Sequence, residues 1–333
     1  MRAFGPRSVR FTRRSILGSA TAVIAAPALA QECRLGPPPH HKGPTVFMGY
    51  DQFELDASYD QDYYEPFGGQ VYGRLASSSD TVRARIGAPQ RVAYGSTEIE
   101  KLDIYRTDRA KAPIFIFIHG GVWIVGSASE AGYAAETFVR AGAHYVVPDF
   151  ASVKDLGGDL GAMATQVRRA VVWVYKNAAS FDGDPDRIYI GGHSSGGHLC
   201  GVALVTDREK DFGIPASIVK GGLCISGMYD MTAVRLSWRN SVVKFTDAMA
   251  DAMSSQRHID KLYAPVTVAY GSLETPDFQR QNRDFAAAVK AAGKPVQLIE
   301  AKNFTHAVMA ESLGNPYGPD GQAALAMMKL GPA

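Results

Sequence analysis

The fold is decided by one stretch of the sequence, RIYIGGHSSGGHL, which runs from Arg187 to Leu199. Its apolar start, residues 188–190, predicts a buried strand, and the residues that follow Gly197 predict a helix. Between the two stands Gly-x-Ser-x-Gly, with Ser194 at its centre. A strand, a sharp turn and a helix in this order are typical of a nucleophile elbow, which holds a serine hydroxyl at the tip of a sheet. Glycines on both sides of the serine relieve the strain of the turn.

The segments around the elbow alternate between apolar strands and helices. This alternation is typical of a mostly parallel sheet whose two faces are both covered by helices. Residues 91–94 and 99–106 add an antiparallel hairpin in front of it. The other expected strands are 114–118, 145–147, 188–190, 221–226, 266–270 and 296–300, and the expected helices are 128–141, 160–180, 277–292 and 322–330.

Two regions stand apart from the alternation. The folded body is expected to run from residue 53 to residue 333, and residues 53–88 are helical in parts. Residues 228–262 have no regular pattern and carry Trp238 and Phe245 with several methionines. We expect residues 228–262 to form a small cap or lid over the site.

The first 30 residues have the pattern of an export signal. TRRSIL at residues 12–17 is a twin-arginine motif, a weakly apolar run follows, and ALA at residues 28–30 is typical of a signal-peptidase site. The run is too short and too rich in Ala and Gly to be a good membrane span. We expect the twin-arginine (Tat) machinery to export the chain, cleavage to occur before Gln31, and the product to be periplasmic or secreted without a stable membrane anchor.

The charge and the cysteine content bear on possible partners and on disulfide bonds. The formal net charge is +2, but five arginines and no acids lie in residues 1–30, so the remainder carries −3 and we expect no nucleic-acid partner. Residues 31–52 are expected to be a flexible mature N-terminus. Three cysteines are too few for a disulfide framework. A bridge between Cys200 and Cys224 is conceivable, but two buried thiols are the simpler interpretation.

A pair of glycines follows the predicted strand 114–118, in the sequence HGGVW at residues 119–123. The carboxyl ends of parallel strands form the ligand crevice of such sheets. Two glycines at this place let backbone N–H groups point into the crevice. We therefore expect the N–H groups of Gly120, Gly121 and Ser195 to form an oxyanion hole.

Two side chains beside the expected hole are candidates for substrate contact. Trp123 follows the glycine pair, and its aromatic ring favours an aromatic or apolar substrate, with core packing as an equally good interpretation. His193 precedes the serine and is the second candidate.

A serine hydroxyl needs a base, and the base needs an orienting acid. Of the eight histidines, His306 follows the last predicted strand in the polar loop KNFTH, as the chain order serine, acid, histidine requires. The acid is expected after the strand that ends at Tyr270. Glu274 is the first carboxylate there and the preferred candidate, and Asp277 and Asp230 stay open as alternatives.

Together these motifs resemble the kynurenine formamidase (arylformamidase) branch of the α/β-hydrolases, which merges into the hormone-sensitive-lipase-like carboxylesterases. The resemblance implies the α/β-hydrolase fold, with Ser194 as nucleophile, His306 as base, and the three oxyanion donors named above. Family members usually have Asp where this chain has Glu274. The similar segments are HGGVW (119–123), DPDRI (184–188), GHSSGGHL (192–199), SGMYD (226–230) and ETPDFQRQ (274–281), within a region that covers nearly all of residues 53–330.

The resemblance implies hydrolysis of a carboxylic ester or an N-formyl or aryl amide through an acyl-enzyme, with no metal or cofactor. Kynurenine breakdown is cytoplasmic, so an exported member is expected to act on another small ester or amide. The short oxyanion loop and its aromatic neighbours predict small acyl groups over long-chain lipids. Two other classes stay open: an acyltransferase that uses the same residues, and a binding protein that keeps the fold without catalysis.

Overall fold

A central sheet of eight strands organises the protein, in a computed structural model that describes residues 35–332. The predicted signal peptide and its cleavage site lie outside the described residues. The strand order is β1-β2-β4-β3-β5-β6-β7-β8, with β1 and β2 antiparallel to their neighbours and all later pairs parallel. The predicted hairpin and the mostly parallel sheet are thus confirmed. The strands are β1 Gln90–Ala93, β2 Lys101–Tyr105, β3 Ala112–Ile118, β4 His144–Pro148, β5 Gly183–His193, β6 Val219–Ile225, β7 Val266–Gly271 and β8 Val296–Ala301.

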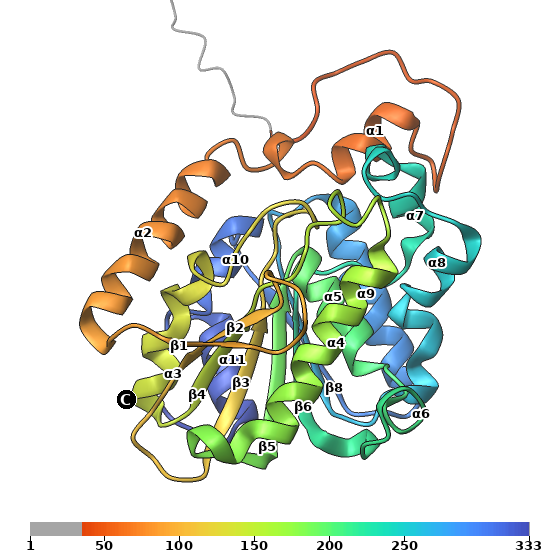
Figure 1. The fold of residues 1–333 in the computed structure, drawn as a ribbon. Coiled ribbons are helices and arrows are strands. Elements are labelled where there is room, and N and C mark those ends of the chain that lie inside the picture. The colour runs from red at the N-terminus through yellow and green to blue at the C-terminus, as the bar shows by residue number, and fades with distance from the viewer. Residues whose placement is uncertain (1–34, 333) are drawn as a thin grey trace, which may run out of the picture. The chain divides into compact units, whose positions relative to one another are not determined.

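Helices cover both faces of this sheet (Figure 1). Side chains of α4, α5 and α9 share one hydrophobic cluster with one face, and side chains of α3, α10 and α11 share a second cluster with the other. The helices are α1 Gln52–Ser58, α2 Gly68–Ile86, α3 Ala135–Ala141, α4 Leu160–Asn177, α5 Ser195–Leu204, α6 Arg208–Phe212, α7 Met231–Leu236, α8 Asp247–Ala252, α9 Pro276–Ala291, α10 His306–Ser312 and α11 Pro319–Met327.

The strand β3 shows why the sequence forms a sheet covered on both sides. Successive side chains of a strand point to opposite faces, and every residue of β3 is buried. Ile114, Ile116 and Ile118 pack into the first cluster, and Phe115 and Phe117 pack into the second. Each such side chain contributes about 1.5–3 kcal/mol when it leaves water. The strand is therefore stable only at the centre of a two-sided core.

The irregular segment 228–262 folds into α7, α8 and short 3-10 turns. It packs against the N-terminal helix α1, where the backbone N–H of Trp238 donates to Asp56 Oδ1 at 2.5 Å.

The part of the N-terminal segment that the structure describes also makes contacts. Asp51 caps α1 and binds His40 Nε2 at 2.8 Å.

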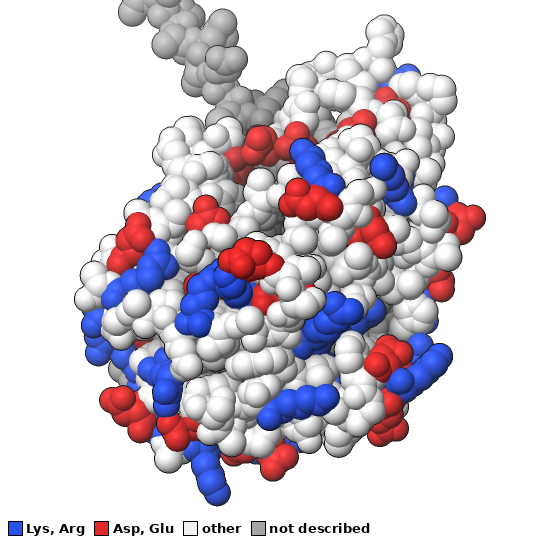
Figure 2. Space-filling model, in the orientation of Figure 1, with Lys and Arg blue, Asp and Glu red and all other residues white. Residues whose placement is uncertain are grey.

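The two cysteines considered for a bridge, Cys200 and Cys224, are free and buried, with their Sγ atoms 3.8 Å apart. Positive and negative side chains are interspersed on the face that Figure 2 shows. No helix within residues 35–332 is long and apolar enough to cross a membrane.

Candidate active site

Ser194 stands on a sharp turn between β5 and α5. Its backbone has φ 59° and ψ −124°, a conformation that non-glycine residues rarely adopt, and its N–H donates to Ile225 O at 2.9 Å. Gly192 and Gly196 make the turn feasible. A Cβ on Gly192 would lie 2.2 Å from Gly196 O, and one on Gly196 would lie 2.1 Å from Ile118 O. The packing around the turn therefore admits no side chain at either glycine.

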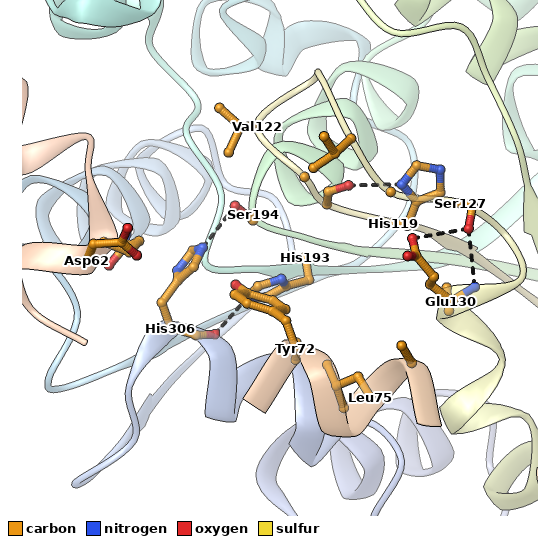
Figure 3. A pocket seen from close by; sticks show the side chains of 18 of the residues that line it. Asp62, Tyr72, Leu75, His119, Val122, Ser127, Glu130, His193, Ser194 and His306 are labelled. Carbon is orange, nitrogen blue, oxygen red and sulfur yellow. Dashed lines mark hydrogen bonds between the residues drawn. The ribbon is translucent and has the colours of Figure 1, made fainter. Parts of the chain in front are cut away.

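The Ser194 hydroxyl is the first member of a hydrogen-bonded chain. Ser194 Oγ lies 2.8 Å from His306 Nε2, and His306 Nδ1 lies 3.1 Å from Glu274 Oε2. Figure 3 shows the His306 ring pointing at Ser194. His306 is the first residue of α10, after its N-cap Thr305, and its ring meets the Phe278 ring edge-on at 5.0 Å. Backbone and packing together fix the imidazole between the hydroxyl and the carboxylate.

Glu274 is held by hydrogen bonds on its other oxygen. Its Oε1 accepts from Ser226 Oγ at 2.6 Å and from the Gly271 N–H at 2.7 Å. The side chain is almost fully buried. Two donors from two different strand ends thus leave Oε2 directed at the imidazole of His306.

The two alternative carboxylates lie elsewhere. Asp277 is buried in the first turn of α9, where it accepts from the Tyr59 hydroxyl and pairs with Arg280 at 2.7 Å. Asp230 caps α7 and pairs with Arg257 at 2.9 Å. Neither carboxylate contacts the imidazole. Of the three candidates, the structure brings Glu274 to the histidine.

The predicted oxyanion donors meet next to the nucleophile. Within residues 35–332 no backbone carbonyl or side chain accepts from the N–H of Gly120 or Gly121, and the N–H of Ser195 belongs to the unpaired first turn of α5. Neither Gly120 nor Gly121 has room for a side chain. A Cβ on Gly120 would lie 2.9 Å from His193 O, and one on Gly121, at φ +113°, would lie 2.0 Å from Val125 O.

Of the two interpretations of Trp123, substrate contact and core packing, the structure favours core packing. The residue has φ 62°, and its side chain, 2% exposed, points into the core rather than into the pocket. Its indole Nε1 donates to His198 Nδ1 at 3.2 Å, and its backbone N–H donates to Ser195 Oγ at 3.2 Å. Trp123 therefore fastens the loop that carries Gly120 and Gly121 to the helix α5.

His193, the second candidate, lines the pocket and also supports the site. Its Nε2 donates to the backbone carbonyl of His306 at 2.9 Å, as Figure 3 shows. Burial, together with the nearby imidazole of His306, holds the pKa of His193 well below its usual value. His193 is thus neutral, with the proton on Nε2.

The pocket in front of Ser194 has a volume of about 580 Å³. Figure 3 shows Tyr72 and Leu75 rising from α2 on one side and His119, Ser127 and Glu130 on another. Most of its lining is apolar, and Asp62, Glu130 and Arg239 are among its charged residues. Such a pocket suits a small, largely apolar substrate.

Arg239 and Trp238 line the pocket from the segment 228–262. Trp238 was named in the sequence as part of the expected cap, whereas Arg239 was not found, because that segment has no regular pattern. Arg239 is buried and donates from Nη2 to Tyr59 O at 2.9 Å, with its guanidinium 4.6 Å from the Trp238 ring. Burial lowers the pKa of Arg239 to about 10, so the group stays charged at neutral pH.

Glu65 also went unnoticed in the sequence. This buried carboxylate accepts from the Thr305 hydroxyl and from the Ala307 N–H, the latter at 2.8 Å. Both donors belong to the start of α10, so Glu65 holds the turn that carries His306. Among residues 35–332 no group of three or more His, Cys, Asp or Glu side chains is arranged to hold a metal ion.

The sequence is similar to that of known proteins. A family model described as BD-FAE matches residues 102–221. The kynurenine formamidase of Danio rerio is 30% identical over 246 residues, which span 72% of this chain and 81% of that protein. The kynurenine formamidase of Salmo salar is 31% identical over 249 residues, which span 72% of this chain and 82% of that protein.

Solved structures agree on the fold. A candidate thioesterase from Silicibacter sp. TM1040 superposes with a TM-score of 0.72 at 23% identity, over 83% of this chain and 99% of that chain. An esterase from Pyrobaculum calidifontis superposes with a TM-score of 0.63 at 18% identity, over 79% of this chain and 93% of that chain. This chain belongs to the kynurenine formamidase family of the α/β-hydrolases, and the protein is a hydrolase of ester or amide bonds.

Proposed function

We propose that the protein is a serine hydrolase that cleaves a carboxylic ester or an N-formyl or aryl amide through an acyl-enzyme, with Ser194, His306 and Glu274 as the catalytic triad. The observation that carries the proposal is the continuous chain from Ser194 Oγ through both imidazole nitrogens to Glu274. A binding protein would have no need for a base and an acid aligned behind one hydroxyl.

In the first half-reaction, Ser194 Oγ attacks the substrate carbonyl while His306 Nε2 takes the hydroxyl proton. Glu274 stabilises the imidazolium and fixes its tautomer. The N–H groups of Gly120, Gly121 and Ser195 stabilise the oxyanion, and a single donor of this kind can be worth about 10²- to 10³-fold in turnover. His306 then gives the proton to the departing alcohol or amine. In the second half-reaction, water attacks the acyl-enzyme with His306 again as the base.

The relatives and the pocket support the proposed substrate class. The Danio rerio and Salmo salar relatives are named kynurenine formamidases, and a further relative from Mycobacterium tuberculosis, 25% identical, is named Esterase LipC. The pocket volume of about 580 Å³ supports small acyl groups over lipid chains. With export by the Tat machinery, the proposed place of action is the periplasm or the exterior.

The test compares wild type with Ser194→Ala on p-nitrophenyl esters of increasing acyl length and on N-formylated aromatic amines. Turnover should favour short acyl groups and vanish in the variant, and a fluorophosphonate probe should label only the wild type. A folded wild type that neither turns over any substrate nor reacts with the probe would favour a binding protein. Product transfer to added alcohols or amines in preference to water would favour an acyltransferase.

A further inference from the structure

The active-site pocket has a second hollow directly behind one of its walls. This groove, of about 400 Å³, lies between α2, α3 and the end of α10. The pocket and the groove have two lining residues in common, Leu75 and Tyr133. These two side chains therefore have open space on both sides, and the wall between the pocket and the groove is one side chain thick.

The backbone on both sides of the wall is fastened, so the separation depends on side chains. Leu75 belongs to α2, and Tyr133 belongs to the 3-10 turn Glu130–Ala134. The Ser79 hydroxyl of α2 donates to Glu130 O at 2.7 Å. The Arg83 guanidinium, one turn further along α2, donates to the backbone carbonyl of Ser129 at 2.6 Å. Helix and turn are thus held at a fixed spacing while Leu75 and Tyr133 fill the gap.

The pocket side of the wall is apolar. Phe117, Ala131 and Ala310 line it next to Leu75, and the Tyr133 ring meets the Phe117 ring edge-on at 6.4 Å. An alkyl or aryl group of a substrate that extends from Ser194 in this direction would end against the wall. Each methylene group that leaves water for such a surface favours binding roughly 4-fold.

The groove side can accept a continued chain. Val82 and Pro316 give it apolar lining. Its lining carries two arginines and two glutamates, and each of them is held in an ion pair. Glu136, for example, pairs with Arg85 at 3.0 Å and with Arg140 at 2.7 Å. An apolar chain that passed the wall would therefore meet no unpaired charge from these side chains.

We propose that Leu75 and Tyr133 determine the substrate length that this enzyme accepts. The fold itself leaves room for a longer chain, and these two side chains close it off. The inference rests on the proposed hydrolase function, because it concerns the group that extends from Ser194 into the pocket.

The test measures kcat/KM of Leu75→Ala and Tyr133→Ala on two series of esters: p-nitrophenyl esters with acyl chains of increasing length, and acetate esters of linear alcohols of increasing length. In one series, the ratio of the ten-carbon to the four-carbon substrate should rise at least about 10-fold over wild type. The series that responds identifies whether the acyl group or the alcohol faces the wall. Val82→Ala is the matched control, because Val82 lines the groove from the same face of α2, two turns beyond Leu75, and does not line the pocket. It should leave the ratio unchanged.

The proposal is wrong if neither wall variant changes the ratio in either series, or if Val82→Ala changes it equally. Leu75→Val and Tyr133→Leu remove fewer atoms and replace any alanine variant whose circular dichroism shows loss of fold. Calorimetric titration of linear alkanols into Ser194→Ala and into Ser194→Ala/Leu75→Ala repeats the comparison without turnover. Tighter decanol binding in the double variant supports the proposal that Leu75 limits chain length, even if no ester is hydrolysed. Equal binding in the two variants overturns that proposal. The failure of the hydrolase proposal is thereby distinguished from the failure of the length limit.

Discussion

His193 Nε2 donates a hydrogen bond to the backbone carbonyl of His306, 2.9 Å away. The residue before the nucleophile thus holds the first residue of the helix that carries the imidazole. Since the pKa of His193 is far below neutrality, this donor is present over the whole physiological range. The link fixes His306 by its backbone, and Glu274 fixes it by its ring.

Loss of this link should impair catalysis more than binding. His193→Ala should lower kcat roughly 10- to 100-fold with little change in KM, because small displacements of catalytic groups carry costs of this size. His193→Gln offers an amide N–H near the position of Nε2 and should recover part of the loss. Steady-state kinetics on a short p-nitrophenyl ester checks both variants. If His193→Ala keeps its full kcat, the link has no positioning role.

The acid of the triad can be identified by a pair of substitutions. Glu274→Gln keeps the size of the side chain but removes the charge that stabilises the imidazolium, and turnover should fall roughly 10²- to 10⁴-fold. Asp277 is not expected to substitute, because it is bound by Tyr59 and Arg280.

Asp277→Asn is the matched control for that experiment. It leaves Arg280 with Asp284 as its remaining partner and weakens a buried hydrogen bond to Tyr59. We expect a loss of about 1–3 kcal/mol in the free energy of unfolding and near-normal kcat. Urea unfolding and kinetics measure the two effects. A dead Asp277→Asn with an active Glu274→Gln would reverse the assignment of the acid.

Asp320 should make stability depend on pH. It is fully buried near the start of α11, and burial raises the pKa of its carboxyl to about 8. The Ser312 hydroxyl donates to Asp320 Oδ2 at 2.7 Å and opposes this rise, but burial is the larger effect and the nearby charge of Glu274 adds to it.

The sign of this dependence follows from the two states. The folded protein keeps the Asp320 proton up to pH about 8, and the unfolded chain releases it near pH 4. Unfolding therefore releases a proton between these values, and stability falls as pH rises. Asp320→Asn should remove this contribution and stabilise the protein at pH 8 by roughly 1–3 kcal/mol. Melting temperatures from pH 5 to pH 8 check it; parallel curves for both proteins would show that Asp320 does not titrate as described.

Export can be tested on the protein made by its native host. The twin arginines at positions 13 and 14 predict a mature chain that begins at Gln31. N-terminal sequencing of the periplasmic and cytosolic fractions measures this directly. A mature cytosolic chain that still begins near Met1 would contradict the prediction, and replacement of both arginines by lysine should retain the precursor in the cytosol.

Local signals were enough for the sheet and the elbow. The strand β3 is apolar at nearly every position, and such a run fits a strand covered on both faces. The turn at Ser194 is flanked by glycines that no other residue could replace. These constraints act between near neighbours, so the sequence displays them.

Contacts between residues far apart in the chain could not be predicted from the sequence. The loop that carries His306 was expected to be irregular, yet α10 begins at this residue, because a short helix depends on packing rather than on its own propensity. Trp123 allowed two interpretations until His198, far along the chain, was placed beside it. The sequence favoured Glu274 as the acid but left Asp277 open, and the decision between them needed the positions of two strand ends.

The carboxylate of Glu65 has a practical consequence for anyone who trims this protein. It binds the first turn of α10 from a position only about thirty residues after the predicted cleavage site. A shortened version that starts at α2 would keep every strand and the whole triad in its sequence, yet it would lose the clamp on the His306 turn. Affinity tags and fusion partners therefore belong at the C-terminus, and the segment between residue 35 and α2 should be preserved as part of the working enzyme.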